Sequence, residues 1–294
     1  MSRAPVRIVL AGAGHAHLIA LRDLARMPRE GISLTVIAPE PESLYSGMVP
    51  GWIAGHFRRE DLAIPVAPLA TACGAALVHD EVAELDPGRR LIRLGGGGTL
   101  DYDVLSLDVG AVSASSGVPG GSLHAVPLRP LSAFLDALGD IERNLPGPRD
   151  PPLAVVGAGA AGVEVVLALH HRFGSRTGAP GSVPLALVAS GGVLDGFPRS
   201  VVRRFARLLA ERGVSVHAGA GVAEVGPKSL HLADGRTLPV STTVWAGHAA
   251  PQPWIARSGL ATDDRGFIRV DRTVRAIGRG DILAVGDAAS FDPR

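Results

Sequence analysis

The sequence has little cysteine, little lysine and no long apolar run. Cys73 is the only cysteine among 294 residues, which excludes an internal disulfide, a CxxC redox pair and a metal site made of cysteines alone. Lys228 is the only lysine and lies in Gly-Pro-Lys-Ser, so the lysine of a nucleotide-binding P-loop is absent. No stretch has the roughly 18 consecutive apolar residues of a spanning helix, and residues 6–14 form too short a run for a signal peptide.

The composition is that of a folded protein, and the net charge favours neither anionic nor cationic partners. The formal net charge is +1, so no nucleic acid is expected as a partner. The length of 294 residues fits one large domain or two small ones, and the hydrophobic content of 46% is ample for a packed core. The histidines, including the adjacent His170 and His171, lack a metal-ligand spacing, so no metal site is expected. We expect a cytoplasmic protein, and a peripheral contact with the inner face of a membrane is left open.

The first part of the chain has the pattern of a strand, a glycine turn and a helix. Residues 6–11 are a β-branched run typical of a buried parallel strand, and apolar residues recur at helical spacing over 18–26. Between them, Gly12 permits a tight turn and Gly14 lets a pyrophosphate approach the helix N-terminus. His17 stands in place of the third glycine of the G-x-G-x-x-G fingerprint.

A second unit carries the complete fingerprint. Residues 153–156 predict a buried strand, a helix follows the glycines, and 185–189 predict the return strand. The three glycines of this turn are Gly157, Gly159 and Gly162. Since strand, glycines and helix are all in place, the pattern predicts a dinucleotide site.

The acid that reads a ribose should lie at the end of the second strand of each unit. In the first unit this end is Pro39, with Glu40 and Glu42 just beyond it. In the second unit the strand ends at Ser190, where no acid is found. Arginines that would suit either a 2′-phosphate or a solvent-exposed helix face follow at Arg199, Arg203 and Arg204. The choice between NADH and NADPH therefore stays open.

A second pattern repeats after each unit, starting at Val82 and again at Val222, 140 residues later. Each copy reads as a short antiparallel excursion and a return strand, which ends at Gly110 in the first copy. The repeat indicates duplication of one nucleotide-binding domain. Near the end of the chain, an apolar strand runs into Gly286 and Asp287, where a helix is predicted to start. The Asp287 carboxylate would accept a hydrogen bond from a sugar hydroxyl, cap the helix, or do both.

Together these features resemble the pyridine nucleotide-disulfide oxidoreductase superfamily, whose members are flavoproteins with two dinucleotide-binding domains. In detail the chain is similar to type II NADH dehydrogenases and to the flavoprotein module sometimes fused to selenide, water dikinase. The stretches that carry the resemblance are 12–17, 44–51, 53–56, 102–106, 244–246 and 286–287.

The resemblance implies an α/β fold of two Rossmann-like three-layer domains, the second inserted in the first. Residues 1–115 plus 246–294 would form the FAD-binding domain, and 116–245 the NAD(P)H-binding domain. Relatives continue well past the position of Asp287, so the first domain is expected to be truncated at its C-terminus. A homodimer is left open.

The resemblance also implies the cofactor contacts. FAD is expected at Gly12, Gly14, His15, Ala16, His17, Pro39, Tyr45, Met48, Val82, Gly110 and Asp287. NAD(P)H is expected at Gly157, Gly159, Gly162 and Glu164. For His15 and His17 a structural role is the alternative. For Glu164 the alternatives are a place on the nicotinamide side and a first-turn helix acid that suits the helix dipole.

The implied reaction is hydride transfer from NAD(P)H to flavin, followed by electron transfer to an unidentified acceptor, with a quinone as one candidate. Positions 45–50 hold no cysteine, so a dithiol relay and the cysteine chemistry of sulfide:quinone reductases are excluded, and Cys73 is expected to be a buried small hydrophobe. The alternatives are a ferredoxin-reductase-like enzyme acting on a protein or small molecule, and a nucleotide-binding module without catalysis.

Overall fold

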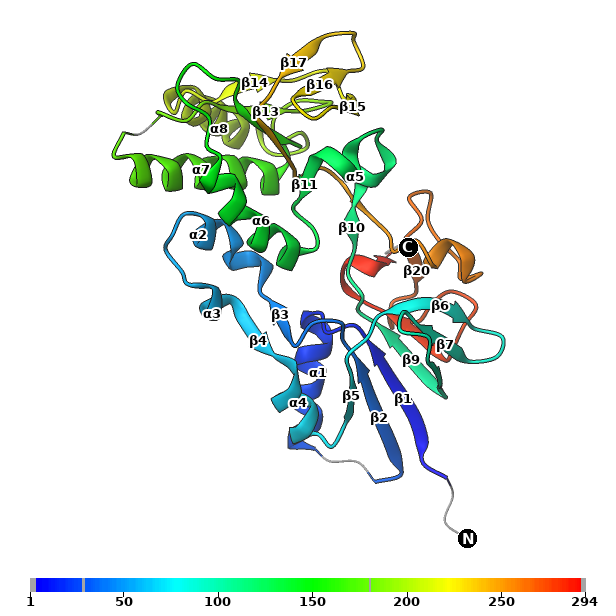
Figure 1. Cartoon of the computed structure of the whole chain (residues 1–294). Coiled ribbons are helices and arrows are strands. Elements are labelled where there is room, and N and C mark those ends of the chain that lie inside the picture. Colours follow the sequence, from blue (N-terminus) through cyan, green and yellow to red (C-terminus); the bar gives the residue numbers. More distant parts are fainter. Residues whose placement is uncertain (1–3, 28–29, 180, 292–294) are drawn as a thin grey trace. The chain divides into compact units, whose positions relative to one another are not determined.

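The computed structural model describes residues 4–27, 30–179 and 181–291, and its internal contacts divide the chain into two compact units (Figure 1). Unit 1 consists of Met1–Tyr45, Ala63–Val112 and Ala250–Arg294. Unit 2 consists of Ser46–Leu62 and Ser113–Ala249. Within the described residues, no helix has the length and apolarity needed to cross a membrane.

Unit 1 is built on a five-stranded parallel sheet. Its order is β21 (Ile282–Ala284), β9 (Val104–Leu107), β1 (Val6–Ala11), β2 (Ile32–Ile37) and β5 (Ala76–Val78). Successive residues of β1 point to opposite faces, and both faces are buried: Val9 packs in one core cluster and Leu10 in another. Burial on both sides explains the continuous apolar run of this strand.

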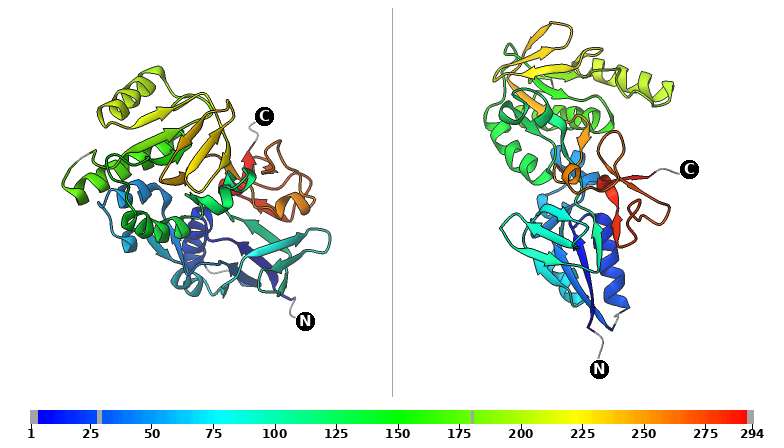
Figure 2. Two further views of the ribbon diagram at one scale, coloured as in Figure 1. Left: turned by 45° about the horizontal axis from the view of Figure 1, so that its top comes forward. Right: turned by 90° about the vertical axis from the view of Figure 1, so that its right-hand side faces the viewer.

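The two faces of the unit 1 sheet are covered differently. Helices α1 (His15–Arg26) and α4 (Val66–Ala72) lie on one face. The antiparallel strands β6 (Val82–Asp86), β7 (Leu91–Leu94) and β8 (Thr99–Asp101) lie on the other, as Figure 2 shows. These layers agree with the predicted three-layer α/β class.

Unit 2 repeats this arrangement in four of its five parallel strands, whereas its outer strand β11 (Ala125–Pro127) precedes the other four in the chain. Its five parallel strands are, in order, β11, β18 (Thr242–Trp245), β12 (Leu153–Val156), β13 (Leu185–Val188) and β14 (Ser215–His217). Its helices include α5 (Gly121–His124), α6 (Leu131–Arg143), α7 (Ala160–Thr177) and α8 (Arg199–Glu211), and its antiparallel strands are β15 (Val222–Val225), β16 (Ser229–Leu232) and β17 (Thr237–Pro239). All residues of β12 and β13 are buried, as expected for inner strands of a covered parallel sheet.

The antiparallel excursions confirm the internal repeat. β6 pairs with β7 through an irregular register between Val82 and Glu84. β15 pairs with β16 through the same irregularity between Val222 and Glu224. Because a bulge depends on its local backbone, its recurrence at equivalent positions supports duplication of one domain. Residues 95–98 form the turn between β7 and β8, as predicted.

The structure differs from the sequence-based expectation in two segments. Residues 46–62, which contain α2 (Val49–Ile53) and α3 (Arg59–Leu62), group with unit 2, where Arg172 of α7 donates to the Ile53 carbonyl at 3.1 Å. After β21 the chain makes one 3-10 turn, Gly286–Ala288, and then strand β22 (Ala289–Phe291), which pairs with β20 (Ile268–Val270). The prediction that a helix starts at Asp287 is therefore wrong: up to residue 291, the last that the structure describes, a strand follows instead.

The remaining elements are short. They are strands β3 (Glu42–Leu44), β4 (Ala63–Pro65), β10 (Val112–Ser113) and β19 (Ala249–Ala250), and 3-10 helices at Ser46–Met48, Ala114–Gly117 and Ile255–Arg257.

Candidate functional site

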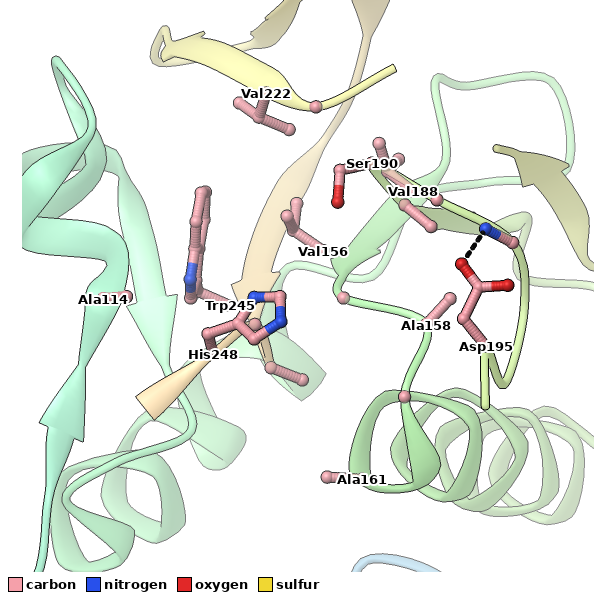
Figure 3. A pocket seen from close by; sticks show the side chains of 18 of the residues that line it. Ala114, Val156, Ala158, Ala161, Val188, Ser190, Asp195, Val222, Trp245 and His248 are labelled. Atoms are coloured by element: carbon pink, nitrogen blue, oxygen red, sulfur yellow. Dashed lines mark hydrogen bonds between the residues drawn. The ribbon is translucent and has the colours of Figure 1, made fainter. Parts of the chain in front are cut away.

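Unit 2 contains a cavity of about 640 Å³ at the carboxyl ends of three parallel strands. Its walls come from the loop after β12, the first turn of α7, the loop after β13 and the residues after β18 (Figure 3). Open α/β sheets bind ligands at this edge, where the chain leaves the strands for the helices. The cavity thus lies where the fingerprint predicts a dinucleotide.

The three glycines of the fingerprint have separate structural reasons. Gly157 has φ +111°, and a Cβ there would lie 2.6 Å from the Ala246 carbonyl oxygen. A Cβ on Gly162 would lie 1.7 Å from the Gly157 carbonyl oxygen, so helix α7 approaches the turn too closely for any side chain. A Cβ on Gly159 would meet no atom within 4 Å. Gly159 lines the cavity, so the space left by its missing side chain is available to a ligand.

The start of α7 suits an anion. Gly159 is the N-cap, no side chain caps the helix, and the first turn has no acidic residue. The helix therefore directs unpaired N–H groups and the positive end of its dipole at the cavity. Because α7 begins at Ala160, Glu164 lies in the second turn rather than the first, with its side chain exposed. Neither Gly162 nor Glu164 is among the described residues that line the cavity.

Different side chains stand at the two ends of the cavity. Ser190 and Asp195 lie on the side of β13, and the Asp195 carboxylate accepts the Gly192 N–H at 2.6 Å (Figure 3). Trp245 and His248 lie on the side of β18. The predicted arginines Arg199, Arg203 and Arg204 belong to α8 and do not line the cavity.

Unit 1 places its incomplete fingerprint at the equivalent turn, between β1 and α1. Gly12 has φ +93°, and Gly14 is the N-cap of α1. The buried carboxylate of Asp108, at the end of β9, lies under this turn and accepts the His17 backbone N–H at 3.1 Å. A Cβ on Gly14 would lie 2.3 Å from this carboxylate, and one on Gly286 would lie 2.6 Å from it. Asp108 therefore lies among the loops that follow β1, β9 and β21.

Sequence reasoning missed Asp108. The signal was an acid directly after the apolar strand 104–107, where a charged residue needs a partner. In unit 1 the carboxylate uses one of the N–H groups at the start of α1. The N–H groups of His15 and Ala16, the first two residues of the helix, have no intrahelical acceptor and suit an anion.

The side chain of His17 points into unit 1 instead of toward a ligand. Its Nδ1 lies 2.7 Å from the Gly12 carbonyl oxygen and its Nε2 lies 2.8 Å from Ser106 Oγ. A carbonyl can only accept, so Nδ1 carries the proton and donates. Burial lowers the pKa of His17, so the ring is neutral and Nε2 accepts from the Ser106 hydroxyl. The structural alternative for His17 is the one that fits this geometry.

The other residues predicted to contact FAD are distributed as follows. The rings of His15 and Tyr45 meet edge to face with centroids 5.1 Å apart, and both residues are exposed. The side chain of Val82 is buried in the core, so only its backbone could reach a ligand. Ala16, Pro39 and Asp287 are exposed and Gly110 has φ +65°, while Met48 groups with unit 2.

Cys73 has no redox partner, because it is the only cysteine. It is half-buried at the end of α4, packs against the core cluster of that helix, and its Sγ donates to the Ala70 carbonyl at 3.3 Å. No group of three or more His, Cys, Asp or Glu side chains in the described ranges could hold a metal ion.

Comparison with known families gives a match over nearly the whole chain. The model of the family described as pyridine nucleotide-disulphide oxidoreductase matches residues 6–294. An NADH dehydrogenase-like protein of Mycobacterium tuberculosis is 26% identical over 97% of this chain and 73% of its own length. A type II NADH:quinone oxidoreductase of Staphylococcus epidermidis is 24% identical over 98% of this chain and 75% of its own length.

Solved structures show the same fold. NDH2 from Plasmodium falciparum in complex with NADH superposes with a TM-score of 0.83 at 18% identity, over 99% of this chain and 66% of that protein. The sulfide:quinone oxidoreductase from Aquifex aeolicus superposes with a TM-score of 0.79 at 20% identity, over 98% of this chain and 70% of that protein. At these identities the likeness is one of fold.

Proposed function

Because the chain belongs to the pyridine nucleotide-disulphide oxidoreductase family, we propose that it is a flavoenzyme that oxidises NAD(P)H, transferring a hydride to FAD and passing electrons on to an acceptor. The observation that carries this proposal is the duplicated unit: two five-stranded parallel sheets that share the order of four adjacent strands, each with a glycine turn between its central strand and a helix. Two dinucleotide sites in one chain suit an enzyme that brings a nicotinamide and a flavin together.

The residues of unit 2 fit a nicotinamide nucleotide. The open space beside Gly159 and the uncapped start of α7 would hold the pyrophosphate. The cavity extends on both sides of this point, toward Asp195 and toward Trp245, which leaves room for the two nucleosides. We therefore assign NAD(P)H to this cavity.

In unit 1 the Asp108 carboxylate fills the space beside Gly14, so the fit to a flavin dinucleotide rests on the start of α1 and not on an open space beside the glycine. The N–H groups of His15 and Ala16 would hold the pyrophosphate, and Asp287 would accept a hydrogen bond from a sugar hydroxyl. Bound FAD supplies the hydride acceptor and the route for electrons to leave. The chain itself binds and orients the two nucleotides, and the reaction needs no nucleophilic side chain.

A quinone is the acceptor that we propose first. Support comes from the relatives named as type II NADH:quinone oxidoreductases and from the single cysteine, which rules out a dithiol relay. A quinone acceptor would suit a protein that touches the inner face of a membrane peripherally, and we propose this location and a homodimer together with it. A ferredoxin-type acceptor is the alternative within the same enzyme class.

An absorbance scan tests the proposal. The purified protein should be yellow, or become so after incubation with FAD, and the flavin band should bleach on anaerobic addition of NADH or NADPH. A protein that stays colourless after incubation with FAD would refute the enzyme proposal for this chain. If the band bleaches, reoxidation by a soluble quinone, compared with a ferredoxin, separates the two acceptors.

A further inference from the structure

We propose that Asp195 determines the choice of nicotinamide nucleotide and makes the chain select NADH against NADPH. This inference rests on the proposed function, since it takes the cavity of unit 2 as the NAD(P)H site. The end of β13 itself carries no acid that could bind the adenosine ribose, because the first polar residue after that strand is Ser190. Asp195 takes this role instead.

Asp195 is placed at the adenosine end of the cavity. In a Rossmann-type unit the adenosine ribose lies beyond the end of the second strand, which is β13 here. The chain turns there through Gly191 and Gly192 and returns, so that Asp195 lines the same cavity as Ser190 (Figure 3). The chain reversal therefore brings an acid back to the region where a strand-end acid would stand.

The carboxylate is held in position by the two glycines. Asp195 Oδ2 accepts the Gly192 N–H at 2.6 Å. A Cβ on Gly191 would lie 2.3 Å from the same oxygen, and a Cβ on Gly192 would lie 2.5 Å from Oδ1. The absence of side chains on both residues thus allows the carboxylate to fold onto the loop. A carboxylate has about four lone-pair sites, so it can still accept a hydrogen bond from a ribose 2′-hydroxyl.

The charges around this end favour the hydroxyl over a phosphate. A 2′-phosphate carries a charge of about −1.5 to −2 and would be repelled by the carboxylate. The described lining of the cavity includes no arginine or lysine, and His248 stands at the far end beside Trp245. The predicted arginines of α8 are outside the lining. Like charges about 4 Å apart near a protein surface are enough for a tenfold or larger loss of affinity.

Equilibrium binding tests the inference without relying on turnover. Calorimetry would compare the affinities for ADP-ribose and 2′-phospho-ADP-ribose. As a separate readout, steady-state assays would compare kcat/KM for NADH and NADPH. The wild type should favour the unphosphorylated ligand by about tenfold or more. Asp195→Asn keeps an oxygen for the Gly192 N–H but removes the charge, so the preference should fall about tenfold. Asp195→Arg should reverse it.

Asp150 provides a matched control. Its Oδ2 accepts the Gly147 N–H at 2.8 Å, three residues back, as Asp195 does with Gly192, and it lies outside the cavity lining. Asp150→Asn should leave the preference between the two ligands unchanged. This variant separates an effect of charge at the cavity from the general effect of losing a carboxylate in a turn.

Three outcomes are distinguishable. If the wild type binds neither ligand, the proposed function fails. If it binds both equally, or if Asp195→Asn changes the preference no more than Asp150→Asn, the inference about Asp195 is overturned while the NAD(P)H site stands. If Asp195→Asn does not fold, the wild type is measured at rising salt: the preference should weaken as charge is screened, and a preference independent of salt refutes the electrostatic explanation.

Discussion

Replacing His17 by glycine would complete the G-x-G-x-x-G fingerprint of unit 1, yet we expect the replacement to lower both the free energy of unfolding and the affinity for FAD. In unit 2 the third glycine is required because a Cβ on Gly162 would collide with the Gly157 carbonyl oxygen. In unit 1 the equivalent Gly12 carbonyl instead accepts a hydrogen bond from the His17 ring. The imidazole therefore fills the space and holds the turn, and a glycine would do neither.

The magnitude of the effect follows from the contacts that are lost. The Gly12 carbonyl would lose its donor in a buried site, which costs about 1–3 kcal/mol, and glycine within a helix costs about 1 kcal/mol relative to alanine. We expect His17→Gly to lower the free energy of unfolding by about 3 kcal/mol. For a unit of this size that corresponds to a melting temperature lower by about 6–12 °C.

Two milder variants separate the contributions. The side-chain amide of His17→Asn can donate near the position of Nδ1 and so keep the bond to Gly12, whereas His17→Gln can reach Ser106 near the position of Nε2. We expect the asparagine variant to retain more FAD affinity than the glycine variant by about tenfold, since one hydrogen bond to the turn is about 1.4 kcal/mol. Thermal melting and flavin fluorescence titration measure the two effects.

Acid sensitivity is a further readout for His17. Burial lowers the pKa of His17 below its ordinary value of 6.5. As the pH falls, the imidazole is therefore protonated in the unfolded chain before it is protonated in the folded chain. The free energy of unfolding that comes from the neutral His17 is therefore fully present above pH 6.5 and is lost as the pH falls below that value. This part of the pH dependence should disappear in His17→Asn. The reasoning is refuted if His17→Gly melts at the wild-type temperature and binds FAD equally well.

Three further predictions concern other positions. Gly159→Ala should leave the melting temperature within about 2 °C but abolish ADP-ribose binding in calorimetry, because its Cβ would meet no protein atom and would fill space that the ligand needs; Gly162→Ala should lower both. Burial raises the pKa of Tyr102 to about 12, so stability should fall as the pH rises from about 10 toward 12, and Tyr102→Phe should remove that fall in alkaline unfolding curves. Hydrogen bonds from Arg7 lower the pKa of Asp103 to about 2, so Arg7→Met should raise it toward 3.8 in an NMR titration.

The local elements followed well from the sequence. The strands at 6–11 and 153–156 lie where the apolar runs predicted them, and the helix after each glycine turn begins at or next to the turn. This works because the signals are local: β-branched runs favour buried strands and glycine turns interrupt them. The repeat beginning at Val82 and Val222 followed from internal similarity for the same reason.

The candidate sites followed less well. Asp108 and Asp195 were missed because each takes its role from loops that meet in space: Asp108 from the turn at Gly12–His17, and Asp195 from a chain reversal at two glycines. The grouping of residues 46–62 with unit 2 was not foreseen either, because it depends on contacts with α7, such as that of Arg172 with Ile53. The hydrophobic periodicity of a short segment predicts its secondary structure, but it does not show which unit of the protein the segment will pack against.

By itself the sequence determined that this protein is a duplicated α/β chain with a dinucleotide turn in each half, because strand runs, helical spacing and turn glycines are properties of neighbouring residues. It also excluded an internal disulfide and a dithiol relay, because a chain with one cysteine can form neither. Only the tertiary structure decided which way His17 faces and which carboxylates stand beside each turn. The physical reason is that these contacts join residues that the loops bring together, and their geometry exists only after the sheets have formed.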